Sequence, residues 1–337
     1  MDGGRECLAV RIDLTSTRVR LGTFTLGAES AARAALFTAD DRALDLVAAV
    51  TILAASGADK FATAFEILHN APVTHSWLTP AGLSAITRVV SAIAGDAACW
   101  YPLHTVRLGV PIPRPGKIIA AGRNYLDHVR EGQQLWAARG RTVEVPKFPS
   151  AFAKFPSSLC AAFTPIVIPP GVEAVDYEVE LAVVIGTAAH NVLEAQALHH
   201  VAGYTLCNDV AARRIQMAEM EQQIGIVLAK NFPTFAPLGP WLVTADEIPD
   251  PQQLAISLTV NGEIRQDAHT RDMIFTVAQL ISYWSQTGLE VGDVISTGTP
   301  AGVAIGRAEP AHFFLRDGDT VTARIERIGE LTNPVRG

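Results

Sequence analysis

The apolar residues of this chain fall mostly into short runs that turn residues separate. Before residue 111 these runs predict two strands, at residues 8–12 and 19–24, and then helical segments rich in Ala and Leu up to about residue 98. The longest weakly polar stretch, residues 46–58, is shorter than a membrane span, and it predicts a buried helix.

The clearest break in this pattern is the proline-rich segment 111–116, which holds three prolines. Proline can neither continue a helix nor donate a hydrogen bond within a central strand, so we place a domain boundary here. The prediction is a small α+β domain over residues 1–110 and a larger domain over residues 111–337. Before the break we find no motif with chemical content.

Short strands dominate the larger domain. Residues 118–122 are typical of a buried strand, and the Asn-Gly pair at 261–262, between two alternating runs, predicts a hairpin. The Asp-Gly pair at 317–318 is a second hairpin candidate, and one amphipathic helix is predicted over residues 276–287. This density of strands predicts an α+β fold, mostly β, with a mixed β-roll or barrel-like architecture.

The composition is that of a globular protein, with 49% hydrophobic residues and a net charge of −7. Because the chain has no long basic run, we predict no nucleic-acid partner and no membrane partner. The N-terminal residues lack the basic and apolar regions of a signal peptide, and a cytoplasmic location is predicted. No zinc site or disulfide framework is indicated by the scattered cysteines, Cys7, Cys99, Cys160 and Cys207.

Three carboxylates, Asp176, Glu178 and Glu180, alternate along the segment that opens the apolar run 181–186. Side chains in a strand repeat every two residues, so all three acids are expected on one face. Burying like charges is costly, and a divalent cation held by carboxylate oxygens removes that cost. The alternative is a solvated edge with three ordinary surface acids.

His128 and Glu131 are three residues apart and would be neighbours on a helical turn. A carboxylate there can orient the imidazole and raise its basicity, which makes a general base for water; a surface pair is the alternative. Lys154 and Lys230 lie among apolar residues. Each is either a surface lysine with a buried stem or a cation that balances charge on a substrate oxygen.

Asp209 stands at the end of a predicted strand and before a helical segment, where it can cap the helix or bind a metal. Arg213 and Gln216 follow at helical spacing and can face the same pocket. The small-residue loop 296–303 contains glycines that allow a ligand to approach the backbone closely. Its amides and the Thr299 hydroxyl can cradle a carboxylate, although a plain turn would look the same.

Taken in order, these motifs resemble the fumarylacetoacetate hydrolase family, over about residues 111–335. The part before residue 111 resembles the variable leader domain that many members carry. The residues that carry the resemblance are Asn124-Tyr125-x-Asp127-His128-x-x-Glu131, Asp176-Tyr177-Glu178-Val179-Glu180-Leu181, Asn208-Asp209-Val210, Lys230 and Thr297-Gly298-Thr299-Pro300-Ala301-Gly302-Val303.

The resemblance implies a metal site and a homodimer. Glu178, Glu180 and Asp209 are the implied ligands of Mg²⁺ or Mn²⁺, with Ca²⁺ as a substitute in crystals, and Asp176 falls outside the ligand set.

The same resemblance implies the catalytic groups. His128 and Glu131 form the implied water-activating dyad on a short lid, and Lys230 faces the substrate oxyanion. The implied substrate contacts are Tyr125, Lys154, Arg213, Gln216 and Thr299.

The chain departs from the family pattern at three places. After Asp209 it reads Ala211-Ala212-Arg213-Arg214-Ile215-Gln216, with Arg214 where the family usually has an acid. After Lys230 it reads Asn231-Phe232-Pro233, where a Ser-Phe-Asp run is common in the family. The segment 132–150 is longer than in the shortest members. It would adjoin the lid, where it either tunes substrate choice or forms a surface loop; its notable residues are Trp136, Arg139 and Arg141.

No pyridoxal phosphate, thiamine or flavin motif is apparent, so we expect a metal-chelated 2-oxo acid to supply the electron sink for carbon–carbon cleavage. The prediction is a metal-dependent hydrolase of an acylpyruvate-like 1,3-dicarbonyl (a 2,4-dioxo acid), active in the catabolism of aromatic compounds or sugars. An oxo-diacid decarboxylase or tautomerase, of the oxaloacetate or hydroxyheptadienedioate type, would use the same site. A non-catalytic member that binds a small acid is the remaining alternative.

Overall fold

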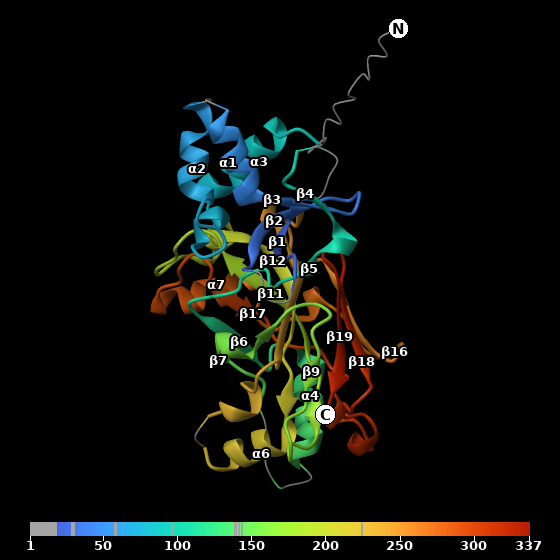
Figure 1. Cartoon of the computed structure of the whole chain (residues 1–337). Coiled ribbons are helices and arrows are strands. Elements are labelled where there is room, and N and C mark those ends of the chain that lie inside the picture. The colour runs from blue at the N-terminus through green and yellow to red at the C-terminus, as the bar shows by residue number, and fades with distance from the viewer. Residues whose placement is uncertain are drawn as a thin grey trace. The chain divides into compact units, whose positions relative to one another are not determined.

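The computed structural model (Figure 1) describes residues 19–27, 31–56, 59–95, 97–137, 140, 142, 144–223 and 225–337, without the side chains of residues 134–136. The predicted strand 8–12 and the residues Cys7, Arg139 and Arg141 lie outside this description, as does the side chain of Trp136. The chain divides into two compact units, of which the first ends at Arg107 and the second runs from Leu108 to Gly337.

The first unit combines antiparallel strands with three helices, and Figure 1 shows these helices grouped together. Its strands run in the order β4-β3-β2-β1. The predicted strand at residues 19–24 is confirmed as β1, whereas residues 33–45, which we predicted as helical, form strands. Pairing along β1 overrides the helix propensity of their Ala and Leu residues. The elements are β1 (Arg20–Thr25), β2 (Arg33–Phe37), β3 (Arg42–Asp45), β4 (Trp100–Pro102), α1 (Leu46–Ala55), α2 (Ala62–Leu68) and α3 (Pro80–Ala92), with β5 (Arg107–Leu108) at the end of the unit.

The second unit consists mostly of strands. They are β6 (Ile118–Gly122), β7 (Ser150–Ala153), β8 (Leu159–Cys160), β9 (Ile166–Val167), β10 (Val175–Asp176), β11 (Val179–Ile185), β12 (Val201–Asn208), β13 (Ala211–Ala212), β14 (Ala236–Thr244), β15 (Ala255–Val260), β16 (Glu263–His269), β17 (Val294–Ser296), β18 (Thr320–Ile325) and β19 (Gly329–Arg336). The helices are α4 (Leu126–Ala137), α5 (Glu194–Ala197), α6 (Arg213–Glu221) and α7 (Val277–Trp284).

One sheet of this unit places β11 near its centre, in the order β14-β12-β11-β17-β6-β7. Every residue of β11 is buried, as expected for an apolar strand covered on both faces. β11 is antiparallel to β12 and to β17, and β17 is parallel to β6. The ends of β6, β12 and β17 and the start of β11 therefore meet in one region, and the polar residues described below lie at or next to these strand termini.

A second sheet runs in the order β16-β15-β18-β19-β9. The hairpin predicted at 261–262 is confirmed, since Asn261 and Gly262 have φ of 53° and 81° between β15 and β16. The hairpin predicted at 317–318 is wrong, because a 3-10 turn and loop, not a strand, precede these residues. The turn leads into β18, and the Gly318 amide donates to the carbonyl of Val335 on β19. The hairpin partner of β18 is β19.

The predicted helix at 276–287 is confirmed as α7 followed by a 3-10 turn, with Gly288 at φ 77° behind it. Thr276 and Gln279 form a capping box at its start. The fold is α+β and mostly β, as predicted, and its sheets are open, not closed barrels. Within the described ranges, no helix has the length and apolar character that crossing a bilayer requires.

Candidate metal and catalytic site

Three buried carboxylates meet where β11 begins and β12 ends. Glu178 precedes β11, Glu180 is the second residue of that strand, and Asp209 follows β12. The strand register sets Val179 opposite Asn208, and the Asp209 amide donates to the Glu178 carbonyl at 2.8 Å. One oxygen of each carboxylate lies within 4.8 Å of the others. All three residues are buried, so the solvated-edge alternative is wrong.

Asp176 does not belong to this acid triad (Glu178, Glu180 and Asp209). It lies on the separate short strand β10, so the expectation of one continuous strand face counts one acid too many. Its carboxylate accepts from Arg213 Nε at 2.7 Å and from the amides of Ala304 and Ile305 at 2.8 and 3.1 Å. Asp176 therefore anchors Arg213 beside the triad.

Two buried lysines bind carboxylates of the triad. Lys230 Nζ donates to Glu178 Oε2 at 2.6 Å and to the carboxylate and carbonyl of Asp209, both at 2.8 Å. Lys154 Nζ donates to Asp209 Oδ1 at 2.7 Å and to the carbonyls of Lys230 and Phe235. The surface-lysine alternative is wrong for both. Because an ammonium has three donors, neither lysine has one left for a substrate oxyanion in this arrangement.

The two glutamates of the triad differ in their neighbours. Arg213 Nη2 donates to Glu178 Oε1 at 2.5 Å, and Lys230 holds the other oxygen. Burial favours the neutral acid, but these two cations outweigh burial and lower the pKa of Glu178. Glu180 instead accepts from the Ser296 hydroxyl at 2.6 Å and from the Gly298 amide at 2.9 Å.

No lysine or arginine within the described chain bonds to Glu180. Its burial, together with repulsion from Asp209 and Glu178, raises the pKa of Glu180 well above the ordinary value. The cluster contains four acids, counting Asp176, against the three cations Lys154, Arg213 and Lys230, so ionisation of all four acids would leave one negative charge without a partner among them. A divalent cation fits this donor set, because hard cations prefer carboxylate oxygens.

The predicted dyad lies on α4, as the spacing required. His128 Nδ1 and Glu131 Oε2 are 3.4 Å apart, which is a long hydrogen bond. The other carboxylate oxygen of Glu131 accepts from the Gly302 amide at 2.8 Å. A Cβ on Gly306 would come within 2.9 to 3.1 Å of the Glu131 carboxyl atoms, so the glycine leaves room for that carboxylate. His128 Nε2 has no hydrogen-bond partner among the described residues.

The start of α4 is fixed by Asn124. Its side-chain amide donates to the carbonyls of Thr297 and Phe275 at 2.8 and 3.0 Å, and its oxygen accepts from the Phe275 amide. The strand end, the helix and the small-residue loop are thereby tied together, which places His128 relative to the triad.

The loop 297–303 serves the site's own acids. The amides of Gly298 and Gly302 donate to Glu180 and Glu131, and both glycines have positive φ, 91° and 104°. The Thr299 hydroxyl donates to the Val179 carbonyl at 3.0 Å and accepts from Gln266. The loop is therefore more than a plain turn, but these amides are not open to a substrate carboxylate as predicted.

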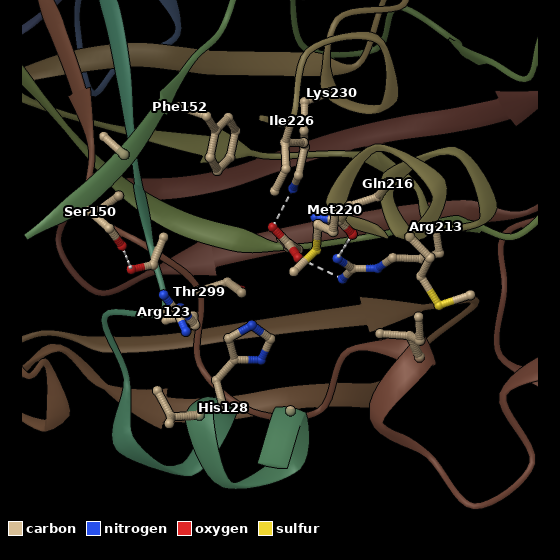
Figure 2. A pocket seen from close by; sticks show the side chains of 18 of the residues that line it. Arg123, His128, Ser150, Phe152, Arg213, Gln216, Met220, Ile226, Lys230 and Thr299 are labelled. Atoms are coloured by element: carbon tan, nitrogen blue, oxygen red, sulfur yellow. Dashed lines mark hydrogen bonds and ion pairs between the residues drawn. The ribbon is translucent and has the colours of Figure 1, made fainter. Parts of the chain in front are cut away.

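A cavity of about 470 Å³ opens beside the triad (Figure 2). Helix α6 presents one face to it, through residues at helical spacing: Arg213, Gln216, Met217 and Met220. Side chains from β7, from the loop after α6 and from a 3-10 turn complete its apolar wall: Phe152, Ile226 and Ile305. Asp209 does not cap α6, whose N-cap is Ala212 without a side-chain bond.

The structure brings most predicted site residues to this cavity. Those that line it are His128, Glu178, Glu180, Arg213, Gln216, Lys230 and Thr299. Lys154 is buried but does not line the cavity. Tyr125 is buried in the hydrophobic core, with no partner for its hydroxyl in the described chain. Burial, and then the charge of Glu180, raise the pKa of Tyr125. Neither Tyr125 nor Lys154 lines the cavity, and their substrate contacts stay predictions.

Sequence reasoning missed several residues of the site. Met217 and Met220 could have been found by extending the helical spacing of Arg213 and Gln216. Gln266 gave no such signal, because it reaches the site from the other sheet: it accepts from the Val179 amide and donates to Thr299.

Comparisons with known proteins agree with this geometry. The family profile of the fumarylacetoacetate (FAA) hydrolase C-terminal domain matches residues 117–336. The mitochondrial oxaloacetate tautomerases of Bos taurus and Homo sapiens are 43% identical over 235 residues, which are 69% of this chain and 71% of theirs.

Two solved structures are similar over most of the chain. The 2-hydroxyhepta-2,4-diene-1,7-dioate isomerase of Mycobacterium marinum is 29% identical with a TM-score of 0.66, covering 94% of this chain and 98% of its own. The fumarylacetoacetate hydrolase of Exiguobacterium antarcticum is 31% identical with a TM-score of 0.69, covering 95% and 99%. The chain belongs to the fumarylacetoacetate hydrolase family.

Proposed function

We propose that the chain is a divalent-metal-dependent enzyme that catalyses a proton shift, keto–enol tautomerisation, in a 2-oxo acid of the oxaloacetate class. The observation that carries this proposal is the position of His128, whose imidazole faces the same cavity as the buried acid triad (Figure 2). Among the similar proteins, the oxaloacetate tautomerases and the diene-dioate isomerase support a proton shift, whereas the fumarylacetoacetate hydrolase supports the hydrolysis that we predicted first.

Glu178, Glu180 and Asp209 would hold the metal, which we propose to be Mg²⁺ or Mn²⁺. When bound, the ion polarises the oxo group of a 2-oxo acid and stabilises negative charge on its oxygen. The fit rests on three buried oxygen donors and on Glu180, which lacks a cation within the described residues.

His128 moves the proton in this proposal. Its neutral Nε2 accepts the proton of the enol hydroxyl and returns it to the adjacent carbon, so the imidazole ends in its starting state. The Glu131 carboxylate accepts a hydrogen bond from Nδ1–H, which would fix the orientation and the tautomer of the ring. The Gly302 amide keeps Glu131 in place, and Lys230 and Lys154 keep Glu178 and Asp209 oriented.

Hydrolysis of an acylpyruvate is the second candidate. The apolar wall favours it, since Phe152, Met217, Met220 and Ile226 suit an acyl group, and about 470 Å³ exceeds the needs of a four-carbon acid. In that reaction His128 would take a proton from the water that attacks the distal carbonyl.

One set of assays tests both candidates. The EDTA-treated chain is assayed for ketonisation of enol-oxaloacetate, for decarboxylation of oxaloacetate and for cleavage of acylpyruvates, each before and after addition of Mg²⁺ or Mn²⁺. Metal-restored ketonisation supports the proposal, and cleavage alone moves the function to the second candidate. Decarboxylation alone keeps the metal site but contradicts both, and turnover of none supports a binding protein.

We further propose a homodimer in the cytoplasm, with a leader domain that ends near residue 107. The division of the chain after Arg107 supports the leader domain, and family membership supports the dimer. Light scattering of the purified chain, whose mass is 36.0 kDa, tests the dimer.

A further inference from the structure

Among the described residues that line the cavity, one arginine has no acid that neutralises it. Arg123 follows β6 and lines the cavity, and its guanidinium has no hydrogen bond or ion pair in the part of the chain that is described. The other cations of the site, Lys154, Arg213 and Lys230, each bind one or two carboxylates. Arg123 is thus a free guanidinium at a substrate-sized cavity.

The backbone at Arg123 directs this side chain to the cavity. Its φ of 56° lies in the left-handed region, which glycine adopts most readily. This turn ends β6, and the three hydrogen bonds of Asn124 hold the next residue in place. The backbone alone would favour glycine at this position, and the arginine instead places a cationic side chain at the cavity.

Figure 2 shows Arg123 beside Thr299, with Arg213 and Gln216 on the opposite side of the cavity and the His128 imidazole between them. A 2-oxo acid held at the triad therefore shares its cavity with the Arg123 guanidinium. Guanidinium binds carboxylate through two parallel hydrogen bonds, and a carboxylate is the group that would neutralise it.

We propose that Arg123 binds the second carboxylate of a dicarboxylic 2-oxo acid and so selects diacids over monoacids of the same length. This inference rests on the proposed function in one respect, that the 2-oxo acid end is held at the triad. Arg123 is exposed, so a monoacid would leave the guanidinium hydrated and would gain no charge-assisted hydrogen bonds from it, which gives the monoacid the lower affinity.

The test compares two ligands of equal chain length, 2-oxoglutarate and 2-oxopentanoate, by calorimetry on the full-length, Mn²⁺-loaded chain. We expect the wild-type chain to bind the diacid roughly tenfold to a hundredfold more tightly, because charge-assisted hydrogen bonds contribute on this scale. Arg123→Gln is expected to remove that preference by weakening 2-oxoglutarate alone. The matched control is Arg327→Gln, an exposed arginine with a similar φ of 66° away from the cavity, which should change neither affinity.

Three results would overturn the assignment: wild-type binding without preference for the diacid, binding of neither ligand, or an equal loss of both ligands in Arg123→Gln. The last would mean that Arg123 supports the 2-oxo end or the site as a whole. If the preference depends on Arg123 but no keto–enol turnover is found, the proposed function fails and this assignment stands.

Discussion

Glu178 and Glu180 are two residues apart and equally buried, yet their surroundings give them opposite behaviour. Glu178 bonds to two cations, whereas Glu180 bonds to a hydroxyl and an amide. Burial and the neighbouring acids consequently raise the pKa of Glu180, while Arg213 and Lys230 lower that of Glu178. At the residue scale, Glu180 is the candidate ligand whose charge would gain most from a metal.

For Glu180→Gln we expect a loss of Mn²⁺ affinity of at least about a hundredfold, because one of three oxygen ligands becomes neutral. The metal-free chain should be no less stable, since the amide oxygen can still accept from Ser296 and Gly298 and a buried charge is removed. Calorimetry with Mn²⁺ and thermal unfolding in EDTA measure the two effects. Glu263→Gln, on the exposed strand β16, is the control. Unchanged Mn²⁺ affinity in Glu180→Gln would exclude Glu180 as a ligand.

For Glu131→Gln we expect kcat to fall by roughly 10² to 10⁴, because His128 loses the carboxylate that orients it, while Mn²⁺ affinity stays near the wild-type value. Steady-state kinetics and calorimetry on the same preparation check both. Arg130→Gln, on the same helix with 62% of its side chain exposed, should leave kcat unchanged. A normal kcat in Glu131→Gln would remove the dyad from the mechanism.

At the scale of the element, features that depend on neighbours in sequence were predictable. The Asn261–Gly262 turn, the capping box at Thr276 and the dyad spacing on α4 all follow from local rules. Features that depend on distant partners were not. Strands β2 and β3 form through pairing against their helix propensity, and Gln266 reaches the site from another sheet. The motif that contains Tyr125 implied a substrate contact and carries no information on whether the side chain is buried. The sequence therefore could not assign Tyr125 to the core.

Gly306→Ala tests how tightly the element after the small-residue loop limits the dyad. The new methyl group would meet the flexible end of Glu131 and push the carboxylate away from His128. We expect kcat to fall by about tenfold to a hundredfold with little change in melting temperature, since a small misplacement of a catalytic group is costly. Gly27→Ala, whose added Cβ meets nothing within 4 Å, is the control. A wild-type kcat for Gly306→Ala would show that the dyad tolerates this shift.

At the scale of the whole molecule, the cavity and the acid triad draw only on the second unit within the described ranges. The order of motifs was enough to predict this, because it follows one family over residues 117–336. The first unit offered no such motif; its strand β1 was predicted, whereas β2 and β3 follow from pairing that the sequence does not display.

A metal that binds the folded chain and not the unfolded chain should stabilise the folded chain. At a Mn²⁺ concentration a hundred times the dissociation constant, linkage predicts about 2.7 kcal/mol and hence a higher melting temperature. Thermal unfolding with Mn²⁺ and with EDTA measures this, and the Glu180→Gln chain should show little difference between the two conditions, because a hundredfold weaker site contributes at most about 0.4 kcal/mol at the same Mn²⁺ concentration. Identical melting of the wild-type chain in both conditions would contradict a metal site at the triad.

The apolar wall and the acid triad stand on different parts of the chain. Met217, Met220 and Ile226 belong to α6 and the loop behind it, whereas Glu178 and Glu180 belong to the start of β11. A one-residue deletion in β11 would turn every following side chain to the other face, so the length and register of that strand are constrained. The side chains of the apolar wall are not under this register constraint. New substrate ranges can therefore evolve, or be selected in the laboratory, by substitutions on α6 and its loop that leave the chemistry intact.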